Sequence, residues 1–139
     1  MQVEESILKQ ISEELLCGFK VFLQRETGDI ITIRDVDLFL GEKDPWENDW
    51  QKVDAERGKY LEFEPMDSRE SYQMMQDFID QLDDGLLADR LVNAIQKKRP
   101  FAHFKAELDD SGPCREKWFQ FRDHRYLEWT REQWEAQIQ

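Results

Sequence analysis

The chain lacks the residues and motifs on which most recognisable catalytic and metal sites depend. It has only 2 cysteines, Cys17 and Cys114, and only 2 histidines, His103 and His124. Neither a C-x-x-C pair nor an H-E-x-x-H segment is present, which excludes the usual redox and zinc motifs. No G-x-S-x-G, Walker or dinucleotide-binding motif occurs either. We therefore predict no metal, no cofactor and no catalytic residue, and an enzyme is the less favoured interpretation.

Long hydrophobic runs are also missing. The longest apolar stretches are a few residues, far short of the ~20 that a membrane-spanning helix needs. Residues 1–10 are polar and acidic and lack the apolar core of a signal peptide. We therefore expect no membrane association and a cytoplasmic location, where cysteines stay reduced. Arg115 and Lys117 lie near Cys114, so a reactive thiol remains an alternative.

Positive charge is scarce, whereas aromatic residues are plentiful. The 19 Lys and Arg residues face 31 Asp and Glu residues, which gives a net charge of -12. Such a charge argues against non-specific nucleic-acid binding by the whole surface, although it leaves room for a local basic site. The 5 Trp, 9 Phe and 3 Tyr predict a folded chain. Its 139 residues fit a single domain over 1–139.

The N-terminal half predicts a helix followed by a small sheet. Apolar residues recur at spacing four over residues 3–16, which favours an amphipathic helix. Alternating and β-branched residues at 19–24 and 30–33 flank a short link containing glycine and predict a β-hairpin. A third alternating run at 59–64 predicts another strand. The stretch 41–58 contains Gly, Pro, Asn and many acids, so we interpret it as loop or turn.

The C-terminal half predicts helices from Asp67 onward. Asp67 or Ser68 is suited to cap the first helix. Gly85 and Pro100 separate further apolar stripes, and Pro113 is suited to begin the last helix. The expected fold class is α+β: a small antiparallel N-terminal sheet of about three strands, covered by a C-terminal bundle of about four helices.

Several aromatic and basic positions carry a family resemblance. They begin with the runs 60–65 and 67–72 and continue through Met75, Phe78, Leu91, Ala94, Ile95, Phe101, Phe104, Lys105, Leu108, Arg115, Trp118, Phe121 and Arg122. In these positions the chain resembles the uncharacterised bacterial protein family UPF0158. The resemblance covers residues 58–125 well and the N-terminal hairpin more loosely. It implies a bacterial cytosolic origin and no particular activity. The family's glycine-rich basic segment corresponds here to Lys97–Pro100, without its glycines, and Ala102 replaces a usual arginine.

The segment 97–125 is locally basic and aromatic. It holds eight positive and five negative side chains within the acidic chain. Helical spacing puts Arg115, Trp118 or Phe119, and Arg122 on one face. Such a face is suited to a phosphate, a carboxylate or an acidic peptide, and its aromatics to stacked single-stranded bases. The candidate ligand-binding residues are Arg69, Lys105, Arg115, Trp118 and Arg122.

An ordinary structural role is the alternative for the same segment. Amphipathic helices bury their aromatic stripe, so Trp118 and Phe121 are equally well interpreted as core residues. The cations would then pair with the surrounding acids.

A second cluster combines acids with tryptophans. Its carboxylates are Glu42, Asp44, Glu47 and Asp49, but their spacing does not match a calcium-binding loop. Trp46 and Trp50 lie four residues apart and are candidate partner-binding residues. The alternative is a loop held to the core by these two side chains.

These observations support two main hypotheses on function. The first is a non-enzymatic binding or regulatory protein with a protein or nucleic-acid partner. The second is an enzyme or binder of a small phosphorylated or carboxylated ligand, held by Arg and Lys on the C-terminal helices. A third idea is nucleic-acid mimicry by residues 1–70, which hold 18 acids and 9 bases. Nothing in the sequence indicates an oligomeric state.

Overall fold

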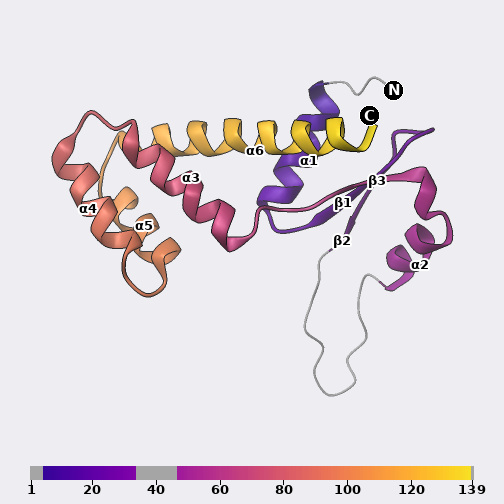
Figure 1. The fold of residues 1–139 in the computed structure, drawn as a ribbon, viewed down its shortest axis with the longest axis horizontal. Helices are drawn as coiled ribbons and strands as arrows, with labels where there is room; N and C mark the ends of the chain where they lie inside the picture. Colours follow the sequence, from indigo (N-terminus) through magenta and orange to yellow (C-terminus); the bar gives the residue numbers. More distant parts are fainter. Residues whose placement is uncertain (1–4, 34–46, 139) are drawn as a thin grey trace, which may run out of the picture. The chain divides into compact units, whose positions relative to one another are not determined.

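The structure, a computed structural model, describes residues 5–33 and 47–138 (Figure 1). Its contacts divide the chain into two compact units: unit 1 comprises Met1–Pro65 and Tyr126–Gln139, and unit 2 comprises Met66–Arg125. The elements in chain order are α1 (Glu5–Leu16), β1 (Lys20–Gln24), β2 (Ile30–Ile33), α2 (Glu47–Ala55), a 3₁₀ turn (Arg57–Lys59), β3 (Tyr60–Phe63), α3 (Ser68–Asp80), α4 (Gly85–Ile95), α5 (Pro100–Asp109) and α6 (Cys114–Ile138).

Unit 1 is built on an antiparallel sheet of three strands in the order β2-β1-β3. The turn between β1 and β2 closes because Gly28 takes a φ of 78°, a conformation that side chains with a Cβ rarely adopt. In the central strand, Phe22 lies opposite Ile31 on one side and Glu62 on the other. The order makes β3 an edge strand, so one side of its backbone faces away from the sheet.

Both faces of the sheet are covered, because successive side chains point to opposite faces. On one face Phe22, Ile33 and Tyr60 form a cluster with Val53 of α2, and Trp50 packs against it. The other face carries fully buried Val21, Leu23, Leu61 and Phe63. Helix α1 contacts β1 and buries Leu8, Ile11 and Leu15. Two-sided burial explains why β1 has three consecutive buried residues.

The stretch predicted as loop contains a helix, so this prediction was wrong. Residues 47–55 form α2, which begins with Glu47 and Asp49 in its first turn. Acids there are favourable because the N-terminal end of a helix carries partial positive charge. Trp50 and Val53, three residues apart, fall on one side of the helix and pack on the sheet. Tertiary burial of these two side chains outweighs the weak helix propensity of the segment.

Unit 2 is formed by α3, α4, α5 and the first part of α6. Asp67 caps α3 by accepting a hydrogen bond from the Glu70 N–H at 2.8 Å, as the sequence indicated. Asp84 caps α4 through the N–H groups of Leu86 and Leu87. The apolar stripes of these helices meet in one cluster, whose fully buried members include Phe78 and Leu91.

The expected α+β fold class is confirmed, and the helices that pack on the sheet include α1 and α2. The sheet is antiparallel, lies in the N-terminal part and has three strands at the predicted positions. Four helices follow it in the described chain, and α1 and α2 belong to the sheet unit. None of the described helices has the length and apolar character needed to cross a membrane. The expectation of a single domain over 1–139 stays a prediction.

Candidate functional site

Two arginines of α6 are stacked on one aromatic ring in unit 2. The guanidinium carbon of Arg115 lies 4.9 Å from the centre of the Phe119 ring, and that of Arg122 lies 4.8 Å from it. The spacing of four and three residues brings the side chains together on one side of the helix. We call these three residues the Arg–Phe–Arg face. Stacking on the ring restricts each planar guanidinium, which lowers the entropy lost when it binds an anion.

Neighbouring acids occupy some of the donors on this face. Arg115 donates from Nε to Asp109 at 3.0 Å, and its side chain is 54% exposed. Arg122 donates from Nε and Nη2 to Asp123 at 3.2 and 3.1 Å. Because a guanidinium has five N–H donors, both arginines keep donor capacity for an added anion.

Trp118 occupies a different environment from Phe119. Its ring centre lies 4.8 Å from that of Phe104 and 5.2 Å from that of Phe78, both edge-on. Phe121 packs on the same cluster, with its ring centre 5.4 Å from that of Phe78. Trp118 and Phe121 are therefore partly buried against the core of unit 2. The sequence left Trp118 and Phe119 as alternatives, and the arginines stack on Phe119.

Arg69 and Lys105 belong to other helices. Arg69 lies in the first turn of α3 and Lys105 lies in the middle of α5, and both are exposed. Among the described residues, no hydrogen bond, ion pair or ring contact joins either side chain to the Arg–Phe–Arg face. Arg115 and Arg122 are therefore the pair of candidate cations that the structure brings together.

Cys114 and His103 of unit 2 lie in settings that do not activate them. Cys114 is buried in the core cluster, and this burial raises the pKa of its thiol, although Lys117 acts in the opposite direction. A raised pKa reduces the fraction of reactive thiolate. The Nδ1 of His103 lies 3.0 Å from the carbonyl oxygen of Arg99, the residue that precedes α5. Neither geometry resembles an activated nucleophile or a positioned general base.

The acidic cluster is described only in part. Glu42, Asp44 and Trp46 lie outside the described residues. Trp50 is half-buried, with its ring edge-on to Phe22 at 5.7 Å between centres. Within the part of the chain that the structure describes, no group of three or more His, Cys, Asp or Glu side chains is placed to hold a metal ion.

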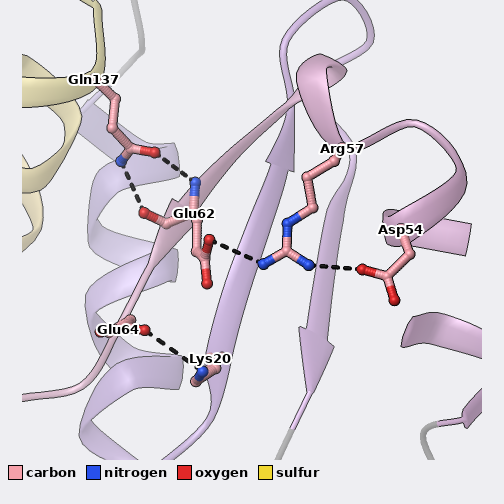
Figure 2. A network of polar contacts seen from close by, with 6 residues as sticks. All are labelled: Lys20, Asp54, Arg57, Glu62, Glu64 and Gln137. Carbon is pink, nitrogen blue, oxygen red and sulfur yellow. Dashed lines mark hydrogen bonds and ion pairs between the residues drawn. The ribbon is translucent and has the colours of Figure 1, made fainter. Parts of the chain in front are cut away.

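Sequence reasoning missed a polar contact between α6 and the edge of the sheet in unit 1 (Figure 2). The Gln137 side chain accepts from the Glu62 N–H and donates to the Glu62 carbonyl, both at 2.7 Å. Gln133 forms the same pair with the backbone of Glu64, at 2.9 and 3.1 Å. We call these four hydrogen bonds the glutamine clasp. Its only sequence signal is two glutamines four residues apart, which is not distinctive.

The side chains of the clasped strand residues lie beside cations. The Glu62 carboxylate accepts from Arg57 at 3.3 Å, and Arg57 also donates to Asp54 at 2.6 Å (Figure 2). These bonds, the one to Asp54 first, raise the pKa of Arg57 above its ordinary value, against a smaller effect of desolvation. The Glu64 carboxylate lies 3.4 Å from the Lys20 ammonium.

Comparison with known proteins gives a family but no activity. The model of the uncharacterised protein family UPF0158 matches residues 7–138. A UPF0158 protein of Pseudomonas aeruginosa is 27% identical over 78 residues, which are 56% of this chain and 51% of the relative. The chain thus spans about half the length of the curated relative that it matches. No solved structure matches it significantly. The match over nearly the whole chain means that this protein belongs to the UPF0158 family.

Proposed function

We propose that this chain is a non-enzymatic binding protein that recognises an acidic segment of a protein partner through its Arg–Phe–Arg face. The observation that carries the proposal is the pair of guanidiniums stacked at 4.9 and 4.8 Å on the Phe119 ring. A carboxylate or phosphorylated side chain matches the fork geometry of guanidinium donors. The face lies on α6 in the locally basic segment 97–125, which favours an anion there over the rest of the chain.

A protein partner fits this face better than a nucleic acid. The net charge of -12 repels a long phosphate backbone, whereas a short acidic segment meets mainly the local charges. Single-stranded bases need a free aromatic surface, but two guanidiniums stack on the Phe119 ring and Trp118 packs into the core. We place this role in the bacterial cytoplasm, in keeping with two free cysteines.

The structure offers less support for a small-ligand site built from the candidate cations. An open hollow of about 250 Å³ lies between α3 and α4 and is lined by residues that include Tyr72, Val92 and Asp80. None of Arg69, Lys105, Arg115 or Arg122 lines it. A ligand held by those cations would therefore have to bind elsewhere on unit 2.

The test compares three tagged proteins in affinity capture from a native bacterial lysate, followed by mass spectrometry. The first is the unchanged chain, the second is Arg115→Ala with Arg122→Ala, and the third is Lys9→Ala with Lys52→Ala. The control pair removes the same two charges from exposed positions of α1 and α2 in unit 1. Circular dichroism checks that each variant is folded.

We expect a partner that the unchanged chain and the lysine control both retain and that the arginine variant loses. When this partner is purified, it should bind the arginine variant at least about tenfold more weakly than the unchanged chain, because charge-assisted hydrogen bonds are lost. Phe119→Leu keeps both charges and removes the stacking, so binding should weaken by about two- to fivefold. The proposal would be contradicted if all three samples captured the same proteins or if no specific partner was captured. It would also be contradicted if treatment with nuclease abolished the capture.

A further inference from the structure

The outer backbone edge of β3 is closed by side chains, where another strand would normally pair. Alternate residues of an edge strand direct their N–H and C=O groups outward, and in β3 and its extension these are Glu62 and Glu64. Each of these residues has both groups bonded to one glutamine amide of α6. A side-chain amide carries one carbonyl and one NH₂ group, so it reproduces the pairing that a peptide group of a neighbouring strand would offer.

The spacing of helix and strand makes this double pairing possible. Four residues of a helix advance about 6.0 Å, and two residues of a strand advance about 6.6 Å. Gln133 and Gln137 therefore reach Glu64 and Glu62 in register, and α6 runs antiparallel to β3 along the pair. The α6 residues stand in the position of a fourth strand without being one.

This edge is reachable from solvent and its side chains are acidic. An open hollow of about 340 Å³ is lined by Glu62, Glu64, Gln133, Ala136 and Gln137. The side chain of Glu64 is 57% exposed and that of Glu62 is 35% exposed. Both belong to unit 1, whose sequence holds 19 acids and 9 bases, a net charge of -10.

Charge decides which strand fits the edge. Antiparallel pairing of β3 with a second copy would bring Glu62 and Glu64 opposite one another, and like charges directly opposite are destabilising. Each carboxylate already has one cationic neighbour, Arg57 beside Glu62 and Lys20 beside Glu64, and keeps acceptor capacity for a second. A strand with Lys or Arg at alternate positions would bring a further opposite charge to each of the same two positions. Backbone pairing would supply the affinity and the alternate side chains the specificity.

We infer that the outer edge of β3 is a strand-addition site for an extended protein segment with basic residues at alternate positions, and that the glutamine clasp keeps it closed in the isolated chain. The incoming strand exchanges the four hydrogen bonds of the clasp, and the one that Trp129 donates to the Glu64 carbonyl, for backbone hydrogen bonds at Glu62 and Glu64. Because α6 stands in the position of a fourth strand, its segment beside β3 must move away from the edge as the strand adds. The site is independent of the Arg–Phe–Arg face, so either proposal can fail without the other.

The experiment opens the clasp with Gln133→Ala and Gln137→Ala in the full chain. The matched control is Glu132→Ala with Glu135→Ala, two exposed positions on the same turns of α6. The probes are a six-residue peptide alternating Lys with Val and the same peptide with Glu in place of Lys. Isothermal titration measures binding, and hydrogen exchange reports on individual amides.

In the open variant we expect faster exchange at the amides of Glu62 and Glu64, while the amides of Leu61 and Phe63, which face β1, stay protected. The lysine peptide should bind it at least about tenfold more tightly than it binds the unchanged chain or the control, because the clasp no longer has to be broken. The glutamate peptide should not bind. Binding should restore protection at Glu62 and Glu64.

Four outcomes would overturn the inference. An open variant that keeps its fold and binds neither peptide excludes a strand-addition site. If both peptides bind equally well, the partner segment need not be basic. If the chain dimerises through β3 and does not bind the peptide, the partner is a second copy and not a basic segment. If the open variant does not fold, the unchanged chain is titrated with excess lysine peptide by NMR. If the side-chain amide signals of Gln133 and Gln137 do not shift in that titration, the inference is overturned.

Discussion

The two units of this chain differ in the chemistry that they expose. Unit 1 holds 19 acids and 9 bases, a net charge of -10, and is organised around a sheet. Unit 2 holds 12 acids and 10 bases, a net charge of -2, and is entirely helical in its regular elements. Most of the acidity of the whole chain therefore belongs to unit 1. The average charge of the chain conceals this difference between the two units.

Each unit has its own buried aromatic anchor, and truncating either anchor should have the largest effect. Phe63 is fully buried in the sheet of unit 1, and Phe78 is fully buried among Phe104, Trp118 and Phe121 in unit 2. We expect Phe63→Ala and Phe78→Ala each to lower the free energy of unfolding by about 3–5 kcal/mol. Urea denaturation measures the loss.

The same pair of variants separates the two units. Hydrogen exchange should increase first in the sheet for Phe63→Ala and first in α3–α5 for Phe78→Ala. If fluorescence and circular dichroism give coincident unfolding transitions for both variants, the chain unfolds as one domain over residues 1–139. Equal acceleration of exchange everywhere would contradict two separate cores.

The two thiols provide a second contrast between the units. Cys17 of unit 1 is exposed, whereas Cys114 of unit 2 is buried and its pKa is raised by that burial. At pH 8 a thiol reagent should modify Cys17 at least about tenfold faster than Cys114. Mass spectrometry of the labelled peptides measures both rates. A modest rise in pH should leave Cys114 slow, because the reagent has no access until the fold opens. Similar rates would show that the core of unit 2 is open around α6.

Removing a helix cap in unit 2 should lower the free energy of unfolding by an intermediate amount. Asp67 and Asp84 accept hydrogen bonds from the first turns of α3 and α4. Each substitution by alanine should cost about 1 kcal/mol, because backbone N–H groups lose their partner. Asp83→Ala, next to the cap of α4, is the control and should change stability by much less. Thermal melting followed by circular dichroism distinguishes them.

The smallest expected effect is a pH-dependent one at Asp77. Its pKa is lowered, first by a hydrogen bond from Gln73 and further by Arg125, whose Nη2 donates at 2.9 Å. A carboxyl whose pKa is lower in the folded chain than in the unfolded chain stabilises the fold at pH values above the unfolded-state pKa of about 3.8. That stabilisation is lost as the pH falls through the pKa of Asp77 in the folded chain.

Asp77→Asn should therefore be less stable than the unchanged chain at pH 6. The difference should be no more than about 0.5–1 kcal/mol, because both partners are about one-third exposed and water screens their charges. The difference should shrink as the pH falls below about 3.8, because Asp77 then becomes protonated in both states. Urea denaturation across this pH range measures the difference, and a constant or growing gap at low pH would refute this account.

Local patterns were sufficient to predict the strands and the main helices. The alternation around Phe22 and Leu61 and the cap at Asp67 depend on residues close in sequence, and all three appear where expected. Helix α2 was missed because burial of Trp50 and Val53 on a distant sheet stabilises it, and such burial leaves no local periodic signal.

The candidate sites were predictable to different degrees. The pairing of Arg115 with Arg122 follows from helical spacing, and the sequence pointed to it. The choice of Phe119 over Trp118 required knowing which side of α6 meets the core. The glutamine clasp joins residues about 70 positions apart through single side chains, so only the folded chain shows it.

The clasp also shows how far a helix can follow a strand in this protein. Each four-residue repeat of a helix advances about 0.6 Å less than two residues of a strand and turns its side chain about 40° further around the axis. Trp129, one repeat before Gln133 in α6, donates to the same Glu64 carbonyl that Gln133 uses, at 2.8 Å, and so adds no third pair in register. The one-to-one match between α6 and the strand backbone therefore covers Glu62 and Glu64.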